Sequence, residues 1–241
     1  MKRFILGFCV AIVFLFPTAG QESELSVEES YLQESIENRI IREQSRGDSR
    51  EMKERALAYI DDAISRGNKS ESIRQALAYM GLEGIKNRGR ENGRLINNYP
   101  DIRRTCAKYL GQLGTPEAKE TLLEMIYNEN EPMVLQEAVK SLADMGIDDR
   151  GKTISAITWI LQKFHNTNPD NLFALSAIEA YEKFGGINSA NLDQNAVEML
   201  NKISEGPYVT PVKDRAMQAL VKIRKAQAQA QQEQQQQRQR Q

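Results

Sequence analysis

Residues 101–114 read DIRRTCAKYLGQLG, and residues 133–146 read MVLQEAVKSLADMG. In both stretches apolar residues recur at steps of three and four, which is the spacing of one face of an α-helix. Both have a small residue near the middle, Cys106 or Ala138, and both end on an apolar residue followed by glycine. The two stretches are therefore two copies of one helical unit.

Two further copies follow along the chain. Residues 172–185 read LFALSAIEAYEKFG, and residues 211–224 read PVKDRAMQALVKIR, with Arg224 in place of the final glycine. The copies end about 32 to 39 residues apart, which leaves room for a second amphipathic helix in each interval. A helix pair that repeats with this period predicts an all-α fold, an α/α superhelix of about four to five helix pairs.

These units resemble HEAT repeats, in particular the short bacterial HEAT-like kind that also occurs in phycobilisome lyases. The resemblance covers about 99–224, and a weaker helix pair at 49–87 lacks the Leu-Gly endings. It implies a helical superhelix with an interaction role and no chemistry, so no lyase activity is implied. The residues that carry it are Asp101-Ile102-Arg103-Arg104, Ala107, Leu110-Gly111, Leu113-Gly114-Thr115-Pro116-Glu117-Ala118, Ala138, Leu142 and Gly146.

Glycine and proline residues fall between the periodic segments and mark where helices end and begin. The polar segment 88–99 contains glycine and is expected to form an exposed loop at a joint. No run of alternating apolar and polar β-branched residues is long enough to predict a strand. We expect helices near 26–46, 49–66, 70–87, 100–113, 116–128, 132–145, 151–165, 170–184, 190–204 and 211–226.

The flanks differ from the repeats. Residues 1–20 have a positive start, an apolar run from Phe4 to Phe16, and then proline and small residues, as in a secretory signal peptide. The run is shorter than the roughly 20 residues that span a bilayer, and a retained membrane anchor is the alternative.

Residues 21–47 are predicted to form a helix that caps the repeats of 48–226 or, alternatively, docks a partner. The glutamine-rich tail 227–241 has no apolar residue larger than alanine and is predicted to be disordered.

Composition excludes several classes of function. A formal net charge of −1 provides no global basic field, which argues against nucleic acid as a partner. The single histidine, His165, is expected at the end of a helix, where a positive ring meets the negative end of the helix dipole. With one histidine the usual zinc sets and histidine-based triads lack members, so we expect no catalytic residue, metal or cofactor. Cleavage after Gly20 leaves Cys106 as the only thiol, which we expect to be buried.

A local cluster of positive charge lies between residues 86 and 104. We interpret Lys86, Arg88, Arg90 and Arg94 as a patch for an acidic partner or an anionic surface, with Arg103 and Arg104 adding to the same charge. The alternative is a solvated loop whose arginines pair with neighbouring repeats.

Trp159 is expected on the solvent side of its helix. The apolar residues Ile154, Ile157, Leu161 and Phe164 form one stripe, and Trp159 projects opposite its centre. Second helices usually line the concave face of such a solenoid, so an exposed tryptophan there predicts a binding hot spot. Packing of Trp159 against an adjacent repeat is the alternative. The expected partner-binding residues are Trp159, Tyr127, Glu124, Glu198, Lys163 and Lys202.

These observations favour an exported, non-enzymatic scaffold or adaptor, periplasmic or secreted, that binds a protein or cell-envelope partner through a curved helical surface. The alternative is an enzyme or enzyme accessory that uses carboxylates in the groove. The sequence leaves the partner's identity and the oligomeric state open.

Overall fold

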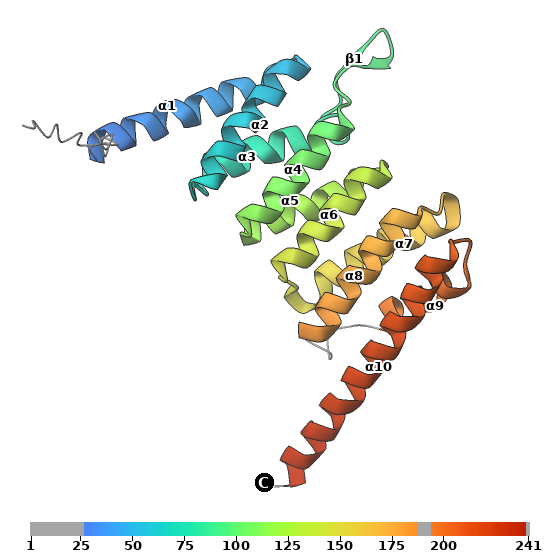
Figure 1. Cartoon of the computed structure of the whole chain (residues 1–241). Coiled ribbons are helices and arrows are strands. Elements are labelled where there is room, and N and C mark those ends of the chain that lie inside the picture. The colour runs from blue at the N-terminus through green and yellow to red at the C-terminus, as the bar shows by residue number, and fades with distance from the viewer. Residues whose placement is uncertain (1–26, 188–193, 240–241) are drawn as a thin grey trace, which may run out of the picture.

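The computed structural model describes residues 27–187 and 194–239, and the predicted all-α solenoid is confirmed (Figure 1). Within these residues no helix is long and apolar enough to cross a membrane. The predicted signal peptide lies outside the described residues. The described helices are α1 (Val27–Ser45), α2 (Arg50–Ser65), α3 (Glu71–Gly81), α4 (Pro100–Leu113), α5 (Pro116–Asn128), α6 (Pro132–Met145), α7 (Lys152–Thr167), α8 (Asn171–Ile187), α9 (Gln194–Glu205) and α10 (Thr210–Gln239).

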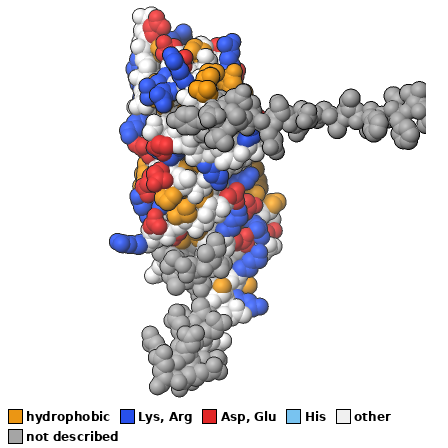
Figure 2. Space-filling model, turned by 90° about the vertical axis from the view of Figure 1, so that its left-hand side faces the viewer, with side chains coloured by type: hydrophobic (Ala, Val, Ile, Leu, Met, Phe, Trp, Pro, Cys, Tyr) orange, Lys and Arg blue, Asp and Glu red, His pale blue; other side chains and the backbone are white. Residues whose placement is uncertain are grey.

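The helices pack in two layers. Helices α2, α4, α6, α8 and α10 contact one another in that order, and α3, α5, α7 and α9 form the second layer in the same way. Helix α1 packs on α2 and α3 at one end of the stack (Figure 1). The apolar stripes of both layers meet in one continuous buried core, which includes Cys106. On the surface, basic and acidic side chains are interspersed with apolar ones (Figure 2). Burial raises the pKa of the Cys106 thiol, so this cysteine is an inert core residue.

The repeated Leu-Gly motifs have two structural roles. Gly111 lies in the interior of α4, where an added Cβ would approach the Cβ of Ser141 on α6 to 2.6 Å, so this position requires glycine for close helix packing. Gly114 and Gly146 end α4 and α6 in the left-handed conformation, with φ of 68° and 66°. Gly185, which aligns with these two residues in sequence, does not end its helix, because α8 continues to Ile187.

The connection between α3 and α4 differs from the prediction. Helix α3 ends at Gly81 rather than near 87, and Gly84 then adopts a φ of +78°, which stops any further helix. The expected loop contains a small antiparallel hairpin, β1 (Arg90–Glu91) and β2 (Arg94–Leu95). Its turn residues Asn92 and Gly93 both have positive φ, as a tight two-residue hairpin turn requires. The hairpin projects from the solenoid (Figure 1).

A buried ionic network anchors this hairpin. Lys53 of α2 donates to the Gly47 carbonyl at 2.7 Å and forms an ion pair of 2.6 Å with Glu83. On the other side Arg103 of α4 forms a two-pronged pair with Glu129, with Nε to Oε2 at 2.6 Å and Nη2 to Oε1 at 3.2 Å. Arg103 also donates to the Asn98 side chain at 2.8 Å. The network therefore ties the long connection to helices on both sides of it.

The C-terminal tail also differs from the prediction. Helix α10 continues to Gln239, whereas the sequence predicts disorder from residue 227 onward. The segment consists mostly of alanine and glutamine, which favour helix without needing tertiary contacts. High intrinsic propensity thus extends the helix beyond Ile223, the last apolar residue that is buried among those whose burial the structure describes.

Deleting residues 227–241 should leave the thermal midpoint nearly unchanged, because the deleted segment adds no large apolar side chain to the core. Circular dichroism melts of the full and shortened chains measure this. A midpoint that falls substantially would show that the tail stabilises the repeats by packing on them.

Candidate partner-binding face

An exposed aromatic pair marks the outer surface of the second layer. We call the exposed surface of α3, α5, α7 and α9 the second-helix face. Trp159 of α7 and Tyr127 of α5 are each 47% exposed on it. Their ring centroids lie 5.4 Å apart with an interplanar angle of 54°, a tilted aromatic contact. The expected exposure of Trp159 is confirmed, and its ring also contacts the neighbouring repeat.

The local sequence explains why Trp159 points outward. Its helix buries the predicted stripe against the core, which leaves the opposite side of the helix to solvent. The buried residues of this stripe are Ile154, Ile157, Leu161 and Phe164.

Lys163 extends the aromatic pair by one turn of α7. Its ammonium lies 5.9 Å from the centroid of the Trp159 ring and donates to the Asn130 side chain at 3.0 Å. A cation over an indole face is attracted to it electrostatically. The three side chains of Tyr127, Trp159 and Lys163 therefore form a surface that combines apolar area with positive charge, as interface anchors commonly do.

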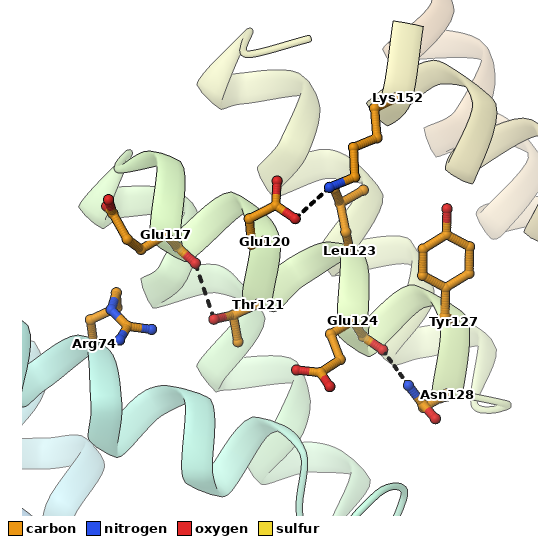
Figure 3. A pocket seen from close by; sticks show the side chains of 9 residues that line it. All are labelled: Arg74, Glu117, Glu120, Thr121, Leu123, Glu124, Tyr127, Asn128 and Lys152. Carbon is orange, nitrogen blue, oxygen red and sulfur yellow. Dashed lines mark hydrogen bonds and ion pairs between the residues drawn. The ribbon is translucent and has the colours of Figure 1, made fainter. Parts of the chain in front are cut away.

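A cavity of about 540 Å³ lies beside the pair, between α3, α5 and α7 (Figure 3). Two of its carboxylates are ion-paired: Glu120 of α5 receives a hydrogen bond of 2.6 Å from Lys152 of α7, and Glu124 of α5 pairs with Lys86 in the connection between α3 and α4. The bond from Lys152 lowers the pKa of Glu120. In Figure 3, Glu120 and Glu124 lie between Arg74 and Tyr127. The cavity is lined by Arg74, Glu117, Glu120, Thr121, Leu123, Glu124, Tyr127, Asn128 and Lys152.

The remaining predicted residues lie on α9. Glu198 and Lys202 form an ion pair of 2.8 Å within that helix. The positive charge of Lys202 also affects the pKa of His165. The Nδ1 atom of His165 lies 3.2 Å from the Tyr208 hydroxyl. Burial first, and then the charge of Lys202, lower the pKa of His165. His165 lies in the last turn of α7, as predicted, and burial and Lys202 favour the neutral form of its ring.

Lowering the pH from about 7.5 to about 5.5 should destabilise the protein through His165. The folded pKa lies below the unfolded value of about 6.5, so the unfolded state binds more protons below that pH. The contribution of His165 to the free energy of unfolding is complete above about pH 6.5 and decreases as the pH falls below that value. Thermal melts should show a smaller decrease in midpoint for His165→Gln than for the unmodified protein. Equal decreases in the thermal midpoint of the two proteins would show that His165 does not cause the loss of stability at low pH.

The predicted anion patch is only partly free. Arg103 is buried in its pair with Glu129 and Arg104 faces Glu137 at 3.5 Å, so neither belongs to an open patch. Lys86 is paired with Glu124. Arg88, Arg90 and Arg94 are exposed on or beside the hairpin, with Arg88 and Arg90 each donating a hydrogen bond to a nearby backbone carbonyl: Ile85 for Arg88 and Gly93 for Arg90.

Sequence reasoning missed Arg74 and Lys152, which line the cavity from α3 and α7. Lys152 is exposed and Arg74 is partly buried, and no motif distinguishes either from other charged helix residues. The cross-helix pair of Lys152 with Glu120 depends on the stacking of neighbouring repeats, which the sequence does not specify.

Residues 94–182 match the family model of HEAT repeats. The matched HEAT-repeat region begins in the hairpin and runs into α8, so it includes Tyr127, Trp159 and every residue that lines the cavity except Arg74. HEAT repeats commonly mediate protein–protein interaction. No relative was found among curated proteins.

Among solved structures, a de novo designed 16-helix transmembrane nanopore is similar to this chain at 14% sequence identity with a TM-score of 0.24. The similarity covers 85% of this chain and 64% of the design's chain. At this TM-score the likeness carries no information on fold or function.

Proposed function

We propose that the protein is an exported, non-enzymatic scaffold or adaptor that binds a protein or cell-envelope partner through the second-helix face. The exposed pair of Trp159 and Tyr127 carries this proposal, since large aromatic side chains that remain half exposed are the typical anchors of protein interfaces. The pair lies within the HEAT-repeat region, whose relatives commonly bind proteins.

The electrostatics of the cavity favour a scaffold over an enzyme that would use Glu120 as its general acid. A carboxyl group that acts as a general acid needs a raised pKa, whereas hydrogen bonding to Lys152 lowers the pKa of Glu120. The ion pair of Glu124 with Lys86 likewise ties that carboxylate to a cation. Both carboxylates act in this proposal as structural links, Glu120 between α5 and α7 and Glu124 between α5 and the α3–α4 connection.

Crosslinking in envelope extracts tests the scaffold proposal. We expect one partner to co-purify with the protein in a fixed ratio. Changing Glu120→Gln should leave both the partner and the function of the complex in place. Loss of function with the partner still bound would instead support the enzyme alternative.

Export is the second part of the proposal, and it is supported by the apolar run 4–16 followed by proline and small residues. The exported species should begin near Gln21, which its intact mass measures. A mass that retains Phe4 to Phe16 would contradict cleavage and favour the anchor.

The hairpin supplies a further contact in this proposal. Arg88, Arg90 and Arg94 are exposed and suit an acidic region of the partner, which gives a contact sensitive to salt. The double variant Arg90→Gln and Arg94→Gln should reduce the salt dependence of partner binding. An unchanged salt dependence would remove the hairpin from the interface.

A further inference from the structure

Both ends of the solenoid expose apolar side chains. On α1, Leu32 and Ile36 are each 59% exposed, and on α10, Met217 is 49% and Val221 68% exposed. A solenoid that stays monomeric usually has terminal helices with polar outer faces, because there is no further repeat to cover them. Each terminal helix here thus presents one apolar pair to solvent.

Each pair forms a continuous stripe, because residues four apart lie on the same side of a helix. The opposite sides of these helices are already occupied. Ile41 of α1 is fully buried, and so are Ala216 and Ala219 of α10. The exposed stripes are therefore outer faces that the protein's own core leaves uncovered.

The two terminal helices carry opposite charge. Residues 27–37 of α1 contain four glutamates and no lysine or arginine. Residues 210–225 of α10 contain five basic residues and one acidic residue, Asp214. Arg224 and Lys225 are exposed at the end of the Met217–Val221 stripe. The charges thus favour contact between unlike ends and oppose contact between like ends.

The order of residues along the stripes also matches. Read forward, the α1 stripe passes from Leu32 to Ile36 and then to Arg39 one turn on. Read backward, the α10 stripe passes from Val221 to Met217 and then to Asp214. An antiparallel crossing therefore sets Arg39 opposite Asp214, and both of these residues are exposed.

We infer that the protein associates head to tail, with the α1 stripe of one copy packed on the α10 stripe of the next. The two helices lie at opposite ends of the solenoid, so one copy cannot close this contact on itself (Figure 1). The contact joins two different surfaces, which produces open chains of copies unless the rotation closes a ring. A contact between two helices falls in the class of weak interfaces, below about 1,200 Å², so association depends on concentration.

Sedimentation of the processed protein over a range of concentrations tests this assembly. The average mass should rise with concentration in the unmodified protein, and Ile36→Glu and Val221→Glu should each remain monomeric. The decisive sample is an equimolar mixture of the two variants, in which one intact α1 meets one intact α10. It should form dimers and nothing larger. Met133→Glu places the same charge on an exposed apolar position in the middle of the solenoid and should associate like the unmodified protein.

Three outcomes would overturn the inference. One is an unmodified protein that stays monomeric at every concentration. Another is association that survives in one of the two end variants, which would indicate contact between like ends. The third is a mixture of the variants that fails to dimerise.

Discussion

Replacing Glu129 by alanine should destabilise the protein by about 3–5 kcal/mol, because it leaves the buried guanidinium of Arg103 without its counter-ion. The same carboxylate accepts the backbone N–H groups of Asn130 and Glu131, at 2.9 and 3.0 Å, just before α6 begins. The substitution therefore removes an ion pair and the support of a helix start together. Chemical denaturation measures the loss.

Two control variants show whether the effect comes from the buried charge. Glu131→Ala changes an exposed neighbour and should cost little. The double variant Arg103→Leu and Glu129→Leu removes both charges and should be more stable than Glu129→Ala alone, since no unpaired ion remains. If Glu129→Ala and Glu131→Ala unfold at the same denaturant concentration, the buried pair has no such role.

Replacing Trp159 by alanine should weaken partner binding by about 2 kcal/mol or more, which is roughly a 30-fold rise in Kd. The substitution removes the larger ring of the exposed pair and the surface over which Lys163 lies. Because Trp159 is half exposed, the thermal midpoint should change little. Titration of the partner recovered by crosslinking measures the Kd.

Tyr59→Ala is the matched control for this substitution. Tyr59 is also an exposed aromatic residue, at 42%, but it lies on α2 in the other layer. Its loss should leave the Kd unchanged. A large fall in stability of Trp159→Ala with partner binding intact would make Trp159 a packing residue and remove it from the interface.

The repeat architecture was predictable because it depends on local signals. The stripe of apolar residues, the glycines at 114 and 146 and the prolines at helix starts each specify an element without reference to the rest of the chain. The same holds for Trp159, whose outward direction follows from the buried stripe of its own helix.

The hairpin at 90–95 was missed although its turn has a clear signal. Asn92-Gly93 is the dipeptide that favours a tight hairpin turn, but the flanking strands are two residues each and too short for an alternating pattern. What holds them is the buried network at their base, which consists of long-range pairs that no local pattern indicates.

Arg103 shows why the charged surface was harder to predict. In sequence it lies in a basic cluster, but in the fold it is buried and paired with Glu129, the residue directly after α5. A charged residue is predicted as exposed unless its partner is known, and here the partner is brought close only when α5 folds back on α4. The cavity residues Arg74 and Lys152 escaped prediction for the same reason.

Site-specific photo-crosslinking tests the assignment of the second-helix face most directly. A photoreactive residue in place of Tyr127 probes that face, and one in place of exposed Lys140 on α6 probes the other layer. We predict that the partner is crosslinked from position 127 and not from position 140. Crosslinking from position 140 without crosslinking from position 127 would contradict the assignment.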